Sequence, residues 1–76
     1  MTISIEKPGV YLTLGGDLAY IMFTNIGSLE RFPAKGFVKV RGTSGYIFAE
    51  WARNGFYADT DPEHKNNLIR FLQEFS

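Results

Sequence analysis

The residues of this chain that could do chemistry are few, and its single histidine is the natural starting point. His64 follows Asp59, Asp61 and Glu63, and carboxylates grouped with an imidazole can bind a divalent cation. The spacing lacks the sixth-position glycine that a calcium-binding loop requires. Thr60 or Asp61 would instead cap a helix, whose first turn favours acidic residues. We therefore predict no metal site and no catalytic role for His64.

Other catalytic constellations are missing from the sequence. The chain contains no cysteine, which excludes thiol chemistry, disulfides and cysteine zinc sites. Gly15-Gly16 has neither the GxGxxG nor the GxxxxGK pattern of a phosphate-binding loop, and a strand pattern follows it instead of a helix. We interpret this pair as a hairpin turn. The sequence thus predicts a protein that is not an enzyme and uses no cofactor.

One set of residues has types that suit binding. Alternate positions of two neighbouring strand patterns, preceded by Lys35, combine large aromatic and basic side chains: Phe37, Lys39, Arg41, Tyr46 and Phe48. Aromatic rings can stack on unpaired bases while cations meet phosphates. The same residue types would also suit a protein interface, because aromatic residues and arginine are enriched at the cores of such interfaces. A third interpretation is that these residues form the second side of a small barrel or sandwich.

A β-hairpin positions that set. Gly36 to Arg41 and Tyr46 to Arg53 alternate as strands do, and Gly42 to Gly45 supplies the turn. A symmetric turn predicts that Arg41 faces Tyr46, that Lys39 faces Phe48 and that Phe37 faces Glu50. The opposite face of the hairpin is wholly apolar, with Val38, Val40, Ile47 and Trp51. We expect that face to be the floor of the core.

Further strands are expected on both sides of this hairpin. Val10 to Leu14 and Leu18 to Phe23 predict a first hairpin, and Ile3 to Glu6 a short edge strand before it. Asn54-Gly55 favours a tight turn into a brief last strand at Phe56 to Asp59.

A helix is expected in the remainder of the chain. Leu68, Phe71, Leu72 and Phe75 recur at i, i+3, i+4 and i+7, which is the apolar stripe of an amphipathic helix over about 61–75. The expectation is a single α+β domain, residues 1–76, with strands over about 3–59. Its sheet would be small, curled and antiparallel, half-barrel-like with four to six strands, and the helix would pack on it.

The composition of the chain limits its domain count and the classes of partner it can bind. The chain has 76 residues, of which 45% are hydrophobic and 16% aromatic, so it is expected to fold as one domain. Eight basic residues balance eight acidic ones, and a net charge of zero disfavours nucleic acid or an anionic membrane as the partner. The start MTISIEKPG lacks a signal-peptide pattern, and no apolar run is long enough to span a bilayer. We expect a cytoplasmic protein.

The order of glycine and aromatic landmarks resembles a loose group of short proteins encoded by tailed phages and prophages. The pattern is G-x-Y-x-T-x-G-G, then F-P-x-x-G, then W-x-x-x-G-x-Y, and it begins here at Gly9, Phe32 and Trp51. An arginine often follows the threonine in that group, whereas Leu14 follows it here. The resemblance implies a small accessory protein that acts inside an infected bacterium by binding a host or defence protein.

Three functions remain open at the level of sequence. The first is a non-enzymatic protein-binding accessory protein, a modulator or inhibitor of a host or defence protein. The alternative is a single-stranded nucleic-acid-binding domain that uses the face from Phe37 to Phe48. A structural homo-oligomer would use the same residues for self-association.

Overall fold

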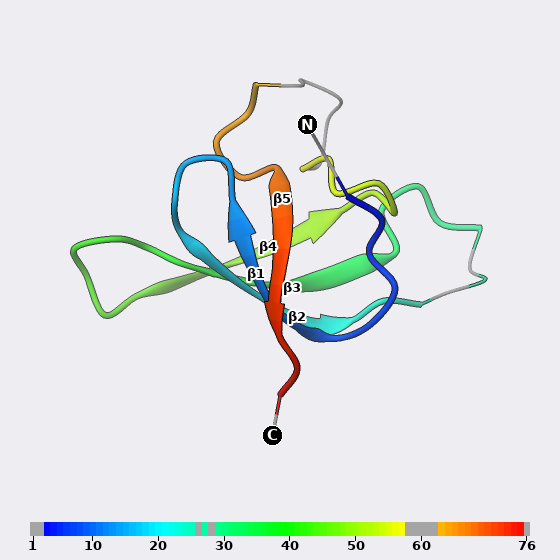
Figure 1. Ribbon diagram of the computed structural model, residues 1–76, viewed down its shortest axis with the longest axis horizontal. Coiled ribbons are helices and arrows are strands. Elements are labelled where there is room, and N and C mark those ends of the chain that lie inside the picture. The colour runs from blue at the N-terminus through cyan, green and yellow to red at the C-terminus, as the bar shows by residue number, and fades with distance from the viewer. Residues whose placement is uncertain (1–2, 26, 28, 58–62, 76) are drawn as a thin grey trace.

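Five strands make up the regular structure of the protein (Figure 1). A computed structural model describes residues 3–25, 27, 29–57 and 63–75. In chain order the strands are β1 (Gly9–Thr13), β2 (Leu18–Phe23), β3 (Ala34–Lys39), β4 (Tyr46–Trp51) and β5 (Leu68–Gln73).

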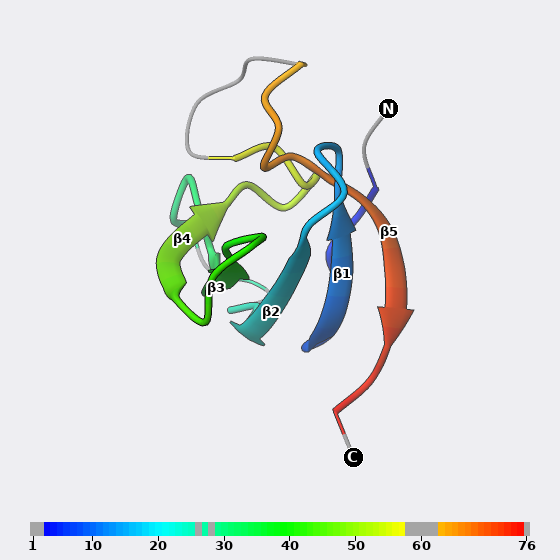
Figure 2. The same cartoon turned by 90° about the vertical axis from the view of Figure 1, so that its left-hand side faces the viewer.

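All five strands belong to one antiparallel sheet in the order β4-β3-β2-β1-β5. The sheet is open, with β4 and β5 at its edges. It is strongly twisted, because β3 and β4 run across the view in which β5 runs from top to bottom (Figure 1), and Figure 2 shows the resulting curl. The antiparallel sheet of four to six strands is confirmed. The α+β class is wrong, because no helix forms in the described residues.

The predicted helix over 61–75 is a strand for most of its described length. Leu68 pairs with Thr13 and Phe71 with Tyr11. Leu68 and Phe71 are three residues apart in β5, whereas Tyr11 and Thr13 are only two residues apart in β1. An extra residue in β5 absorbs the difference as a β-bulge, and a second register shift follows before Val10. Bulges therefore place apolar residues three apart on one face of a strand, which imitates the spacing of a helix.

Two of the expected short strands do not form as such. Ile3 to Glu6 lies outside the sheet, but the Ile5 N–H donates to the Arg53 carbonyl at 2.8 Å and the Ile5 side chain is buried. The expected strand at Phe56 to Asp59 is reduced to one bridge between Tyr57 and Trp51, and residues 58 and 59 lie outside the described residues.

The predicted turns at Gly15-Gly16 and Asn54-Gly55 are confirmed. Gly16 has a φ of 89°, and its N–H donates to the Thr13 carbonyl at 3.0 Å to close the turn between β1 and β2. Gly55 has a φ of 90° and donates to the Ala52 carbonyl at 2.9 Å. A positive φ is the conformation for which glycine is favoured over other residues.

One face of the sheet carries the core. Its buried apolar side chains come from all five strands and from the segment before β1: Ile5, Tyr11, Ala19, Ile21, Ala34, Val38, Ala49, Trp51 and Leu68. Trp51 is fully buried, and its indole Nε1–H donates to the Asn66 carbonyl at 2.8 Å. Segments 52–57 and 63–67 lie beside each other (Figures 1 and 2), joined by a bond from the Tyr57 N–H to Asn67 Oδ1 at 2.8 Å. These segments and the N-terminal lead-in close this face.

Candidate functional site

The second face of the sheet is open and aromatic. Strand alternation turns Tyr20, Phe37 and Phe48 away from the core, and the register places them side by side across β2, β3 and β4. Further apolar side chains surround this row. We call the whole set the aromatic face, which consists of Tyr20, Met22, Phe37, Tyr46, Phe48 and Phe75.

The rings of the aromatic face contact one another in specific geometries. Phe37 and Phe48 meet edge to face with centroids 5.9 Å apart, and Tyr20 meets Tyr46 in the same way at 5.8 Å. Phe75 stacks nearly parallel to Tyr20, at 6.5 Å and 11°. Such pairs stabilise an arrangement by about 0.5–1.5 kcal/mol beyond the area they bury. The rings are thus held in place by one another, although nothing in the described residues forms a further layer over them.

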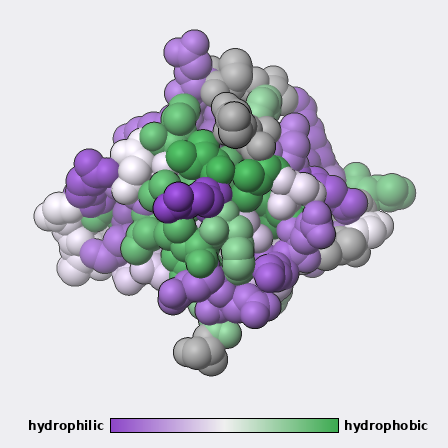
Figure 3. Space-filling view, viewed as in Figure 1, coloured by the Kyte–Doolittle hydropathy of each residue, from purple (hydrophilic) through white to green (hydrophobic). Residues whose placement is uncertain are grey.

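A groove of about 420 Å³ opens on this face, lined by Tyr20, Met22, Phe37, Tyr46 and Phe75. Every side chain of this lining is aromatic or a thioether, so the groove can bind apolar groups. Apolar residues also gather near the centre of the surface seen in Figure 3, over β1 and β5, around one strongly hydrophilic residue, and further hydrophilic residues lie to the sides and below.

The register of the second hairpin differs from the expected one by two residues. Lys39 pairs with Tyr46, Phe37 with Phe48, and Lys35 with Glu50. The four-residue turn lies at Arg41 to Ser44, one residue earlier than the expected Gly42 to Gly45, because the ladder closes at Val40 and Gly45, where the Val40 N–H donates to the Gly45 carbonyl at 3.0 Å. A shift of two residues preserves the alternation, so Phe37, Lys39, Tyr46 and Phe48 share one face of the hairpin as predicted. The opposite face was expected to be the floor of the core, but its Ile47 is 44% exposed because it lies near the end of the hairpin, outside the core cluster.

The basic residues of the predicted set are engaged within the protein. Lys39 lies at the rim of the aromatic face, where Nζ donates to the Thr43 carbonyl at 2.7 Å and lies 5.6 Å from the Tyr46 ring centroid. Arg41 is not on this face. Its guanidinium lies 3.3 Å from the Asp17 carboxylate and donates to the Gly15 carbonyl at 3.0 Å, so it ties the second hairpin to the first turn.

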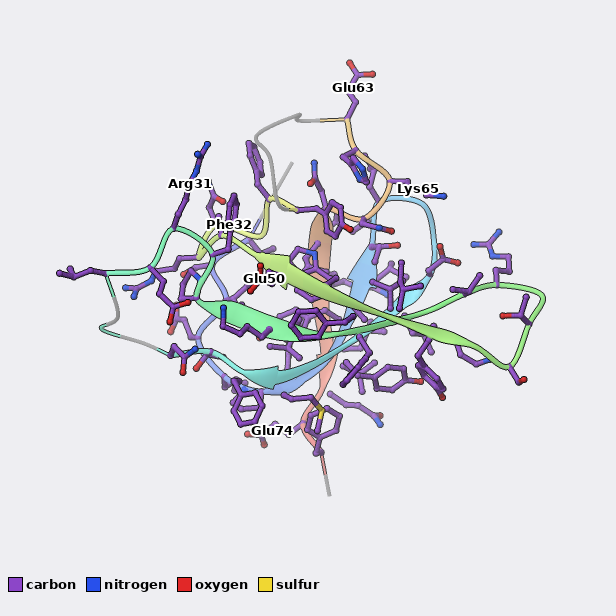
Figure 4. The ribbon with its side chains drawn as sticks, turned by 180° about the vertical axis from the view of Figure 1, so that it is seen from behind. Arg31, Phe32, Glu50, Glu63, Lys65 and Glu74 are labelled. Atoms are coloured by element: carbon purple, nitrogen blue, oxygen red, sulfur yellow. The ribbon has the colours of Figure 1, made fainter. Side chains whose placement is uncertain are left out.

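Lys35 is engaged even more fully. Its Nζ bonds to the carboxylates of Glu50 at 2.8 Å and Glu30 at 2.9 Å, and to the Phe32 carbonyl at 3.2 Å. The hydrogen bonds to Glu50 and Glu30 raise the pKa of Lys35. Figure 4 shows Glu50 over β3 and β4, whereas Arg31, Glu63 and Lys65 point outward at the periphery. The candidate site is therefore apolar, and its nearest cations are already paired.

Sequence reasoning missed three residues of the aromatic face. Tyr20 and Met22 alternate with the core residues of β2. Because the residues on both faces of β2 are apolar, the alternation alone could not show which face is exposed to solvent. Phe75 follows β5 and was assigned to the apolar stripe of a helix instead. The signal that was present is the run Leu18, Tyr20, Met22 at every second position.

His64 is placed as a structural residue. Its Nδ1 accepts the Asn66 N–H at 3.1 Å, and its ring centroid lies 4.6 Å from that of Tyr57. Across the described ranges, no three His, Asp or Glu residues are grouped as a metal site requires. Asp59, Thr60 and Asp61, which completed the predicted cap and acidic cluster, lie outside those ranges.

Comparison with protein-family models, with curated protein sequences and with solved structures gave no match to this chain. In the described part of the chain, no helix has the length and apolar character needed to cross a membrane.

Proposed function

We propose that this chain is a non-enzymatic accessory protein that binds another protein through its aromatic face. The observation that carries the proposal is the exposure of large apolar side chains on a sheet whose other face already forms the core. Met22, Phe37, Tyr46, Phe48 and Phe75 are between 40% and 59% exposed.

The size of this surface supports a protein partner. A whole aromatic side chain buries roughly 150–250 Å², so five half-exposed side chains offer an apolar patch on the order of 500 Å². The largest apolar patch of a soluble monomer is about 300–600 Å² and is often functional. Rings that are already packed against one another also lose little side-chain entropy on binding. The aromatic face therefore has the composition of an interface core.

The cations argue against the alternative, a single-stranded nucleic-acid-binding domain. Stacked bases require positive groups within reach of their phosphates. Lys35 is paired with two carboxylates, Arg41 with Asp17, and Lys39 with a backbone carbonyl. To bind a phosphate, each of these cations would have to give up its present contact. The electrostatic contribution of phosphate contacts to the affinity for nucleic acid is therefore small.

The biological setting of the proposal rests on the resemblance to phage and prophage accessory proteins. In that setting the partner is a host or defence protein in the cytoplasm of an infected bacterium, and binding modulates or inhibits it. The aromatic face accounts for how such a protein acts without a catalytic group.

The test uses two binding assays, of which the first compares two variants. Phe48→Ala removes a ring from the aromatic face, and Leu29→Ala removes a large apolar side chain outside it that is even more exposed, at 102% against 59% for Phe48. On immobilised protein incubated with an extract of the native cell, a partner should be retained by the parent and by Leu29→Ala and lost by Phe48→Ala. Truncation of a central interface aromatic costs about 2 kcal/mol or more.

The second assay measures anisotropy of a labelled single-stranded oligonucleotide at physiological salt. We expect no binding at micromolar protein. Tight binding that both Phe48→Ala and Lys39→Ala weaken would overturn the proposal in favour of the nucleic-acid-binding alternative.

A further inference from the structure

The two edges of the open sheet are built differently. β5 has two register shifts against β1, and Arg70 in its middle is exposed. Bulges and charged side chains are devices by which proteins prevent an edge from pairing with another chain. β4 pairs with β3 in an unbroken register from Tyr46 to Trp51, with neither bulge nor proline. The one charged residue of β4, Glu50, is paired with Lys35. Trp51 at the end of β4 forms a bridge with Tyr57, so the outer edge that lacks the protection of β5 runs from Tyr46 to Phe48.

The backbone of β4 directs free hydrogen-bonding groups outward. Val40 and Gly45 form a bonded pair, and bonded pairs recur at every second residue of an antiparallel ladder. Ile47 therefore directs its N–H and C=O toward β3, whereas Tyr46 and Phe48 direct theirs to the outer edge. Within the described ranges, no strand lies beside this part of β4.

The same short segment is apolar and exposed on both faces of the sheet. Tyr46 is 55% and Phe48 59% exposed on the aromatic face, and Ile47 is 44% exposed on the opposite one. The hairpin of β3 and β4 projects from the body of the protein (Figure 1), beyond the segments that close the core. An added strand would find unpaired backbone groups between two apolar surfaces.

We propose that β4 pairs antiparallel with β4 of a second copy of this chain, with the two-fold axis at Ile47. In this register Tyr46 of each copy bonds through its backbone to Phe48 of the other, which uses the outward groups of both residues. Their rings form cross-strand aromatic pairs, and the two Ile47 side chains cover each other on the opposite face. The aromatic faces of both copies then lie in one continuous sheet of two chains.

Self-pairing is favoured over a foreign strand by symmetry and charge. Tyr46, Ile47 and Phe48 complement themselves about a two-fold axis, as an isologous interface requires. Each copy has zero net charge, so the two copies have no overall repulsion. Three half-exposed side chains contribute about 300 Å² per copy, below the roughly 800 Å² per partner of a standard interface. The dimer should therefore be weak, with a Kd in the micromolar range or above, and reversible.

Cross-linking tests the register directly, because the chain has no cysteine of its own. The two Ile47 positions would be a non-hydrogen-bonded pair with Cα atoms about 4.5 Å apart, within the range of a disulfide. Under mild oxidation Ile47→Cys should form a covalent dimer. Leu72→Cys is the matched control, because Leu72 is 37% exposed on β5 at the other edge. It should remain monomeric, and equal cross-linking of the two variants would contradict the proposal.

Two measurements complete the test. In sedimentation, the parent should dimerise as its concentration rises, and Leu72→Lys should behave like it. Ile47→Lys should remain monomeric, since like charges would face each other directly.

Hydrogen exchange of the parent, which needs no variant, should show that the exchange rates of the Tyr46 and Phe48 amides fall as protein concentration rises. A parent that stays monomeric up to millimolar concentration, or amides that exchange equally at all concentrations, would overturn the proposal. The partner capture described above does not depend on this pairing, so the two proposals can fail separately.

Discussion

The two faces of the sheet are built from the same strands and differ in what covers them. On β4, Trp51 is 0% exposed and Phe48 is 59% exposed, and on β2 the neighbours Ile21 and Met22 are 0% and 45% exposed. Both faces are rich in large apolar side chains. The core face is closed by segments from outside the sheet, including the lead-in with Ile5 and the segment before β5. Apolar content alone therefore does not distinguish a core from a binding surface.

The same comparison separates stability from binding. Removing a side chain from the closed face leaves a cavity, because its neighbours are fixed on all sides. Removing a side chain from the open face leaves no closed cavity, because water occupies the vacated space. Substitutions on the two faces should thus affect different measurements.

The largest effect is expected at Trp51. Trp51→Ala should lower the free energy of unfolding by about 3–5 kcal/mol, because it empties the centre of the core and leaves the Asn66 carbonyl without its donor. A small domain has about that much stability in total. Urea titration followed by circular dichroism should show an unfolded or barely folded protein.

Trp51→Phe is the matched control for that experiment. It retains most of the buried ring and loses the indole N–H, so it should fold with reduced stability. If Trp51→Ala unfolds at the same urea concentration as the parent, the core face does not hold the domain together.

A smaller loss is expected at Gly36, where two strands approach too closely for a side chain. A Cβ there would collide with the Tyr20 carbonyl and lie 2.9 Å from the Cα of Ile21. Gly36→Ala should therefore cost about 1–3 kcal/mol by forcing β2 and β3 apart. In Gly45→Ala the added carbon meets only Thr43 Oγ1, at 3.5 Å, so thermal unfolding should separate the two variants. Equal melting temperatures would show that the close approach is absent.

The pH dependence of stability should also separate the faces. Burial raises the pKa of Tyr11, whose hydroxyl donates to the Lys7 carbonyl at 2.6 Å. The folded state thus favours the protonated phenol, and this contribution is complete below the unfolded pKa of about 10 and lost as pH rises through the folded value. Melting temperature should fall above about pH 10, less steeply in Tyr11→Phe. Tyr46→Phe, with an exposed side chain, should follow the parent, and identical slopes in all three proteins would contradict this account.

The sequence predicts the parts of this fold that depend on local chemistry. The Gly15-Gly16 and Asn54-Gly55 turns and the faces of the second hairpin follow from conformational preference and from a period of two. These signals act within a few residues, so they survive a shift of two residues in the register. For the same reason Phe37, Tyr46 and Phe48 could be assigned to one surface.

Long-range pairing could not be predicted in the same way. Leu68 and Phe71 share a face because β5 bulges against β1, and nothing within residues 61–75 encodes that partner. Arg41 extends the alternation of its strand but bonds to Asp17 and Gly15, in a turn that is distant in sequence. Phe75 joins the aromatic face only because β5 is a strand that leads it to Tyr20. Tertiary contacts decided each of these placements.

The measurement that tests the central claim most directly combines stability and binding in Phe48→Ala. We expect its free energy of unfolding in urea to fall by no more than about 1.5 kcal/mol, because the ring is more than half exposed and its edge-to-face contact with Phe37 is the main interaction lost. The same preparation should no longer retain the protein partner that the parent and Leu29→Ala retain. A loss of stability of the size expected for Trp51→Ala would show that the aromatic face belongs to the core. Unchanged partner retention by a folded Phe48→Ala would show that binding occurs elsewhere.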